Sequence, residues 1–220
     1  VLHRRQRQMC IRDSTSGVGG TDRNFEVVPS RIAGSDSIYE ASPINGTGLT
    51  YVYRSDGSGD SSNNTGFFFL FKQGSMQLVD FAVEQATTNF VKPIDTAGIN
   101  DTDVWLYRLD EFGQIIEEWE KVPALAGNNA IYNSLSKNKR NIFNVVSKVD
   151  DTIDLVFGDG NFSNLPLGNF RTYYRTSDNE KYAIQPSDMS NVQIQVPYSD
   201  KNGATQTLTI AMSLKGSIYN

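Results

Sequence analysis

Alternation of polar and apolar residues dominates the chain and predicts β-strands nearly throughout. Residues 192–196 read Val-Gln-Ile-Gln-Val and residues 205–210 read Thr-Gln-Thr-Leu-Thr-Ile. Strict alternation is typical of a strand with one buried face, and the Asn202-Gly203 pair between the two runs is a favoured turn. We therefore predict two strands joined by a turn in this region.

Four further pairs of apolar runs flank short turn-like segments, and they predict four more hairpins. They pair 67–71 with 76–81, 104–109 with 114–119, 142–149 with 152–157, and 170–175 with 181–185. Only residues 124–139 have a helical pattern, which Gly127, Asn128 and Asn129 weaken. We predict a mainly β fold of antiparallel hairpins and small sheets, with at most one or two short helices.

The same pattern predicts the domain organisation. We expect an N-terminal β unit over residues 15–123, a connecting segment over 124–141 with room for a short helix, and a C-terminal β unit over 142–220. Residues 56–65 are polar without an apolar anchor and should form an exposed loop. We interpret the chain as a truncated fragment of a larger protein.

The first fourteen residues differ in composition from everything that follows. They hold His3 and Cys10, the only histidine and cysteine, and no apolar run follows their arginines as a signal peptide would require. A transit peptide and a nucleic-acid arm are compatible with the RRQR run. Residues 4–14 can also be written in codons as the adapter and transposon mosaic end used to prepare shotgun sequencing libraries. We interpret residues 1–14 as a non-native segment on this correspondence.

Composition limits the available chemistry. Without residues 1–14 the chain holds 16 basic and 24 acidic residues, a net charge of −8, which argues against nucleic acid or an anionic membrane as partner. It then also lacks histidine and cysteine. We therefore predict no Ser-His-Asp or Cys-His catalysis, no imidazole or thiolate metal site, and no cofactor.

Carboxylates supply two weaker candidates for chemistry. Glu117, Glu118 and Glu120 could include a pair for glycoside hydrolysis, although acidic residues on an exposed strand are far commoner. Asp56, Ser58 and Asp60 match the first, third and fifth positions of a calcium loop. The sixth and twelfth positions are Ser61 and Phe67 instead of glycine and glutamate, which favours a loop without metal.

The segment from Asp154 to Gly168 is the most distinctive. A strand runs into Gly158-Asp159-Gly160, where the glycines are suited to positive φ, and an irregular connection follows. Pro166 and Gly168 end that connection before the next strand. We predict a structural corner that redirects the chain, with a ligand role for Asp159 as the alternative.

Residues 156–175, VFGDGNFSNLPLGNFRTYYR, resemble the FGDG…G..P.G…YR signature of the baseplate J-like family of contractile-tailed phages. Within that family the chain is most similar to the T-even-type baseplate wedge subunits (gene product six). Further similar stretches follow in order, so the resemblance covers residues 17–220. They are 22–32, 55–74, 99–106, 131–146, 182–198 and 207–214.

The resemblance implies a structural role without catalysis. Such subunits pair as homodimers, join other wedge proteins and form a ring around the tail hub that transmits the baseplate's change of shape during infection. It implies a location in the virion tail baseplate, assembled in the host bacterial cytoplasm. It also implies that the chain lacks the N-terminal portion of such subunits and stops at residues 218–220, where they continue.

Two alternatives stay open. One is a glycan-binding or glycan-cleaving β module of a tail spike, and the other is the equivalent part of a bacterial contractile injection system. Aromatic side chains beside carboxylates in a groove would favour the glycan module. Aromatic side chains buried inside the hairpins would favour the structural subunit.

Overall fold

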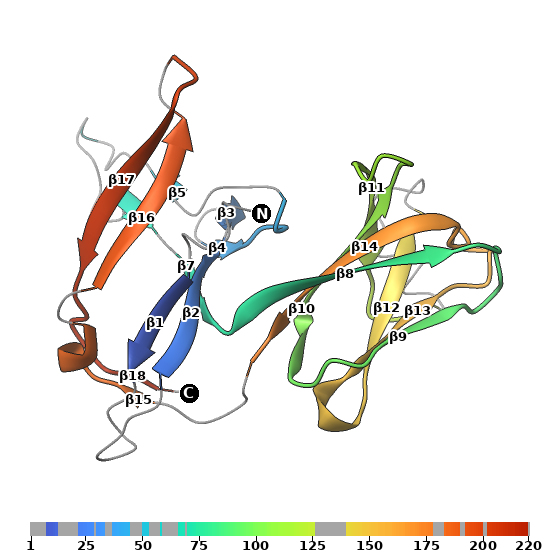
Figure 1. Cartoon of the computed structure of the whole chain (residues 1–220), viewed down its shortest axis with the longest axis horizontal. Coiled ribbons are helices and arrows are strands. Elements are labelled where there is room, and N and C mark those ends of the chain that lie inside the picture. Colours follow the sequence, from blue (N-terminus) through green and yellow to red (C-terminus); the bar gives the residue numbers. More distant parts are fainter. Residues whose placement is uncertain are drawn as a thin grey trace. The chain divides into compact units, whose positions relative to one another are not determined.

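The computed structural model describes residues 8–12, 22–28, 30–33, 37–44, 50–52, 58, 66–68, 70–125, 140–177, 183–189, 192–199 and 202–219. The fold is mainly β, as predicted (Figure 1). Its described helical elements are two short 3-10 turns, η1 (Val149–Asp151) and η2 (Pro186–Met189). Within the described residues, no helix is long and apolar enough to cross a membrane.

The chain forms two compact units. Unit 1 combines Val1–Ser75 with Glu180–Asn220, and unit 2 is Met76–Asn179. The boundary predicted at 124–141 needs correction, because strands on either side of it belong to one sheet. β11 (Ile115–Lys121) pairs in parallel with β12 (Ile142–Ser147), with Glu120 opposite Ile142. Residues 126–139, which carry the helical pattern, lie outside the described residues.

Unit 1 consists of small antiparallel sheets. β1 (Gln8–Arg12), β2 (Asp22–Val28) and β7 (Leu70–Gln73) form the largest, so part of the segment interpreted as non-native pairs with β2. The other four described sheets have two strands each, and three of them are β3 (Ser30–Ala33) with β4 (Ser37–Glu40), β5 (Thr50–Val52) with β6 (Gly66–Phe68), and β15 (Ala183–Ile184) with β18 (Ile218–Tyr219).

The predicted turn at Asn202-Gly203 is confirmed. β16 (Val192–Ser199) pairs with β17 (Thr205–Met212) without a register shift, and Gly203 has φ +80° between them. The register sets Ile194 opposite Ile210. The backbone register therefore aligns the alternating sequence patterns of the two strands.

Unit 2 is a curled seven-stranded sheet (Figure 1). The strand order is β8 (Ser75–Val83), β14 (Gly168–Thr176), β10 (Ile99–Leu109), β11, β12, β13 (Ile153–Phe157) and β9 (Val91–Ile94). Its buried core consists of Val83, Ile94, Ile99, Val104, Leu106, Trp119, Phe143, Ile153, Leu155, Phe157, Phe170 and Tyr174. Full burial of one such side chain stabilises the fold by about 1.5–3 kcal/mol.

Aromatic rings join the strands of this core. The Trp119 ring meets the rings of Phe157 and Phe170 edge-on, with centroids 5.4 and 5.6 Å away. Phe170 also stacks on Phe81 at 5.4 Å. These contacts link β8, β11, β13 and β14, so the curl of the sheet is fixed by ring packing as well as by backbone pairing.

Two predicted hairpins of unit 2 are confirmed, and both have strong local turns. β10 and β11 pair antiparallel, and the Asp110 carboxylate accepts hydrogen bonds from the backbone N–H groups of Phe112 and Gln114. β12 and β13 pair antiparallel around Asp150 and Asp151, which have φ values of +60° and +52°. Aspartate tolerates this region better than most residues do.

The other two predicted hairpins are wrong. In the first, β7 pairs with β2, whereas β8 lies beside β14 in the sheet of unit 2. In the second, β14 lies between β8 and β10, whereas β15 pairs with β18. An apolar pattern shows that a strand has a partner but does not identify it, and here distant strands take the place of the sequence neighbour.

A bulge interrupts β10 near its start. Asn100 lies opposite Arg175 and Val104 lies opposite Tyr174, so Asp101, Thr102 and Asp103 have no counterpart on β14. A buried ion pair follows from this geometry, with Arg175 Nε 3.0 Å from Asp103 Oδ2. Their side chains are 2% and 4% exposed.

Candidate functional site

The predicted corner lies between β13 and β14 and depends first on Gly158. A Cβ at this position would stand 1.9 Å from Ser163 Oγ and 2.8 Å from Ser163 Cβ. Gly158 does not have positive φ, so the expectation that it needs an unusual backbone angle is corrected. The position needs glycine because the corner folds back onto it.

The other two glycines of the corner need unusual backbone angles. Gly160 has φ +87° and Gly168 has φ +100°. A Cβ on Gly160 would also contact Leu165 at 3.2 Å, whereas Gly168 has open space around it. Pro166 between them is buried. The corner therefore combines one close approach with two left-handed positions.

Asp159 lies between Gly158 and Gly160 and stabilises the turn there. Its carboxylate accepts hydrogen bonds from the backbone N–H of Asn161 and from Asn161 Nδ2, both at 2.9 Å. These bonds, the backbone one most, lower the pKa of the Asp159 carboxyl. The described residues contain no group of three or more acidic, histidine or cysteine side chains placed to hold a metal. Of the calcium-loop pattern only Ser58 lies within them, and Asp56 and Asp60 lie outside.

Arg140 joins the corner to the start of β12. Its Nη2 donates to the carbonyl oxygens of Gly160 and Asn161 at 2.9 and 3.0 Å. In return, the backbone N–H of Asn164 donates to the Arg140 carbonyl oxygen at 2.7 Å. Arg140 thus anchors the corner through its side chain and through its backbone carbonyl group.

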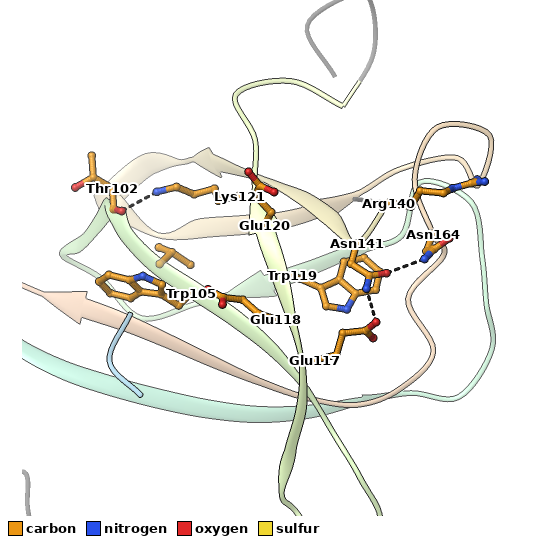
Figure 2. A pocket seen from close by; sticks show the side chains of 11 residues that line it. Thr102, Trp105, Glu117, Glu118, Trp119, Glu120, Lys121, Arg140, Asn141 and Asn164 are labelled. Carbon is orange, nitrogen blue, oxygen red and sulfur yellow. Dashed lines mark hydrogen bonds between the residues drawn. The ribbon is translucent and has the colours of Figure 1, made fainter. Parts of the chain in front are cut away.

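A groove with a volume of about 710 Å³ lies beside this corner in unit 2 (Figure 2). It is lined by Thr102, Val104, Trp105, Glu117, Glu118, Trp119, Glu120, Lys121, Arg140, Asn141 and Asn164. β11 runs through its middle, with Trp105 and Glu118 on one side of the strand and Asn141 and Asn164 on the other. The groove thus has two walls of different chemistry.

The wall next to the corner is a chain of side-chain hydrogen bonds. Asn164 Nδ2 donates to Asn141 Oδ1 at 2.7 Å, and Asn141 Nδ2 donates to Glu117 Oε1. Arg108 Nε donates to Glu117 Oε2 at 2.8 Å. Both Glu117 oxygens therefore accept hydrogen bonds, which fixes the orientation of this carboxylate.

The opposite wall contains an aromatic ring and a carboxylate. Trp105 is half-buried, and Glu118 is exposed without a hydrogen-bond partner among the described residues. Lys121 donates from Nζ to the carbonyl oxygens of Asp101 and Thr102 at 2.9 and 2.7 Å, as Figure 2 shows for Thr102. Its ammonium group is thereby held against the bulge of β10.

Residues 5–217 match the family model described as a domain of unknown function, DUF8360. The chain belongs to this family. The match includes residues 5–14 of the segment interpreted above as non-native. None of the curated proteins and none of the solved structures matches the chain.

Trp119 is one of the lining residues of the groove in this DUF8360 domain, and its ring packs on Phe157 and Phe170 of the core. The side chain is 4% exposed, and its Nε1 has no hydrogen-bond partner in the described part of the chain. A buried donor without an acceptor costs about 1–3 kcal/mol. Because this N–H is buried, the polar groups that the groove presents are the amide and carboxylate side chains of its lining.

Sequence reasoning identified the three glutamates of this DUF8360 groove and missed the rest. Arg140, Asn141 and Asn164 lie more than twenty residues from Glu117, and only the pairing of β11 with β12 and the fold of the corner bring them together. No local motif marks them. Gly158, Asp159 and Gly160 stand out in the sequence because turn residues carry their own local pattern, and they lie in the connection between β13 and β14.

Proposed function

We propose that the chain is a structural subunit of a baseplate wedge in a contractile-tailed phage. In this role it acts in tail assembly and in the rearrangement of the baseplate during infection, as part of the virion tail. The proposal starts from the resemblance of residues 17–220 to such subunits. Its partners are then a second copy and other wedge proteins, and it carries out no catalysis.

The observation that carries the proposal is the construction of the corner. Gly158 leaves space for the Ser163 side chain, and Gly160 and Gly168 have positive φ. The Asp159 carboxylate accepts a hydrogen bond from the backbone N–H of Asn161. All of these signature residues serve the shape of the connection between β13 and β14. A corner of fixed shape suits a protein that must present strands to its neighbours at a defined angle.

The state of the candidate catalytic groups also supports a structural role. Tyr107 is fully buried and Trp119 is 4% exposed, so these two aromatic side chains of the β10–β11 hairpin lie inside the fold. Glu117 has both oxygens engaged by Arg108 and Asn141. A general acid needs a carboxyl group that is free to exchange a proton with substrate.

Co-expression with the other wedge proteins of a contractile-tailed phage tests the proposal. We expect the full chain to sediment with them as one complex. The Gly158→Val variant should sediment separately from them. Gly216→Val is the matched control, because a Cβ there meets nothing within 4 Å. Sedimentation of the unaltered chain apart from every wedge protein would overturn the proposal.

A further inference from the structure

The groove beside β11 is a preformed surface. On one wall, Arg108, Glu117, Asn141 and Asn164 fix one another through successive hydrogen bonds. On the other, Lys121 is fixed by two backbone carbonyl oxygens. Polar groups that are already oriented lose little side-chain freedom when a ligand binds, so such a surface is suited to binding.

The charge of the groove selects against anions. Its lining holds three carboxylates, on Glu117, Glu118 and Glu120, and two cations, on Lys121 and Arg140. Both cations donate to carbonyl oxygens of the chain itself. A phosphate or sulfate would meet a net negative surface whose positive groups are already engaged.

The remaining polar groups match hydroxyl groups. The exposed Glu118 carboxylate is an acceptor without a hydrogen-bond donor among the described residues. The Asn141 and Asn164 amides add donors and acceptors to the same groove (Figure 2). A hydroxyl both donates and accepts, so a ligand rich in hydroxyls can satisfy both kinds of group.

Trp105 adds a flat apolar surface. Its half-buried indole lies across β11 from the amide wall, on the side of Glu118 (Figure 2). Sugar rings combine an apolar C–H face with a rim of hydroxyls, and a groove of about 710 Å³ has room for more than one linked ring. We propose that this groove binds a neutral oligosaccharide. This activity is separate from the assembly role proposed above and does not depend on it.

The chain reports on this site without a label, because its two tryptophans, Trp105 and Trp119, both line the groove. The probes are three neutral tetrasaccharides, built from α-linked glucose, β-linked glucose and N-acetylglucosamine. We expect at least one to give a saturable change in tryptophan fluorescence, with weaker binding by the matching monosaccharide. Absence of a saturable change with all three tetrasaccharides would overturn the proposal.

Variants place the binding in the groove. Trp105→Ala should weaken the binding of that tetrasaccharide about tenfold or more, and Glu118→Gln should weaken it several-fold. Glu84→Gln changes an exposed acid outside the groove and should leave binding unchanged. Circular dichroism and melting confirm that each variant folds. Equal affinity in Trp105→Ala and the unaltered chain, measured by calorimetry, would contradict the proposal, as would tighter binding of a sulfated tetrasaccharide.

Discussion

Ser163 occupies the space that a side chain at residue 158 would need. An ideal Cβ on Gly158 would lie 1.9 Å from Ser163 Oγ, far inside contact distance. Ser163 is 1% exposed, and its Oγ has no hydrogen-bond partner among the described residues. Residues 158 and 163 therefore interact through steric packing, and substitutions at these two positions should have coupled effects on the free energy of unfolding.

Gly158→Ala should cost about 1–3 kcal/mol in the free energy of unfolding, because the added methyl group overpacks a filled corner. Ser163→Gly empties the space and should cost about 1 kcal/mol through the added freedom of the unfolded chain. The double variant should be more stable than the sum of the two costs predicts. Urea unfolding of the four proteins measures the coupling, and strictly additive costs would contradict the steric explanation.

Gly160→Ala tests the left-handed backbone angle together with the 3.2 Å approach of a Cβ to Leu165. Gly160 has φ +87°, and a left-handed residue with a Cβ costs about 1–2 kcal/mol. Gly216 lacks positive φ and a Cβ there has open space, so Gly216→Ala should change stability by less than about 0.5 kcal/mol. Equal melting temperatures for the two variants would show that the corner tolerates a side chain.

Asp159 should titrate at unusually low pH, because hydrogen bonds from Asn161 favour its charged form. Since its pKa is lower in the folded state than the ordinary value of about 3.9, its stabilising effect is present above about pH 4. That effect is lost as the pH falls through the folded-state pKa. Carboxyl NMR titration measures the midpoint. Asn161→Ala should raise it only in part, since the backbone N–H remains.

Loss of the buried ion pair should be costly. Asp103→Ala removes the carboxylate that lies 3.0 Å from Nε of Arg175, whose side chain is 2% exposed, and should destabilise unit 2 by about 3–5 kcal/mol. Lys148→Ala breaks the more exposed Lys148–Asp154 pair, and it should cost less than about 1 kcal/mol. Chemical unfolding compares them. The combination of Asp103→Leu with Arg175→Met should recover much of the loss, and no recovery would contradict this account.

The opening segment allows a direct comparison of sequence with structure. The codon correspondence predicts that a chain beginning at Thr15 melts within about two degrees of the full chain, which is less than 1 kcal/mol for a protein of this size. The structure pairs Gln8–Arg12 with Asp22–Val28. A drop of several degrees in a calorimetric scan would show that this pairing stabilises unit 1 and would contradict the non-native interpretation.

The fold was predictable from sequence where contacts are local. The hairpins at 104–119 and 142–157 were found because Asp110–Gly113 and Asp150-Asp151 make their own turns. The apolar runs on either side of Gly74 resemble a hairpin equally well, but β7 and β8 join sheets in different units. Pairing over long sequence separations depends on the whole fold, so the strand partners and the amide wall of the groove could not be predicted.

Unit 2 is continuous in sequence, and it interrupts unit 1. During synthesis unit 2 has all its residues once Asn179 is made, whereas unit 1 must wait for the segment that begins at Glu180. The chain enters unit 2 through β8 and leaves it through β14, and these strands are neighbours in the sheet. Folding of the inserted unit on the ribosome therefore shortens the effective loop between the two halves of unit 1 and lowers the entropy cost of joining them.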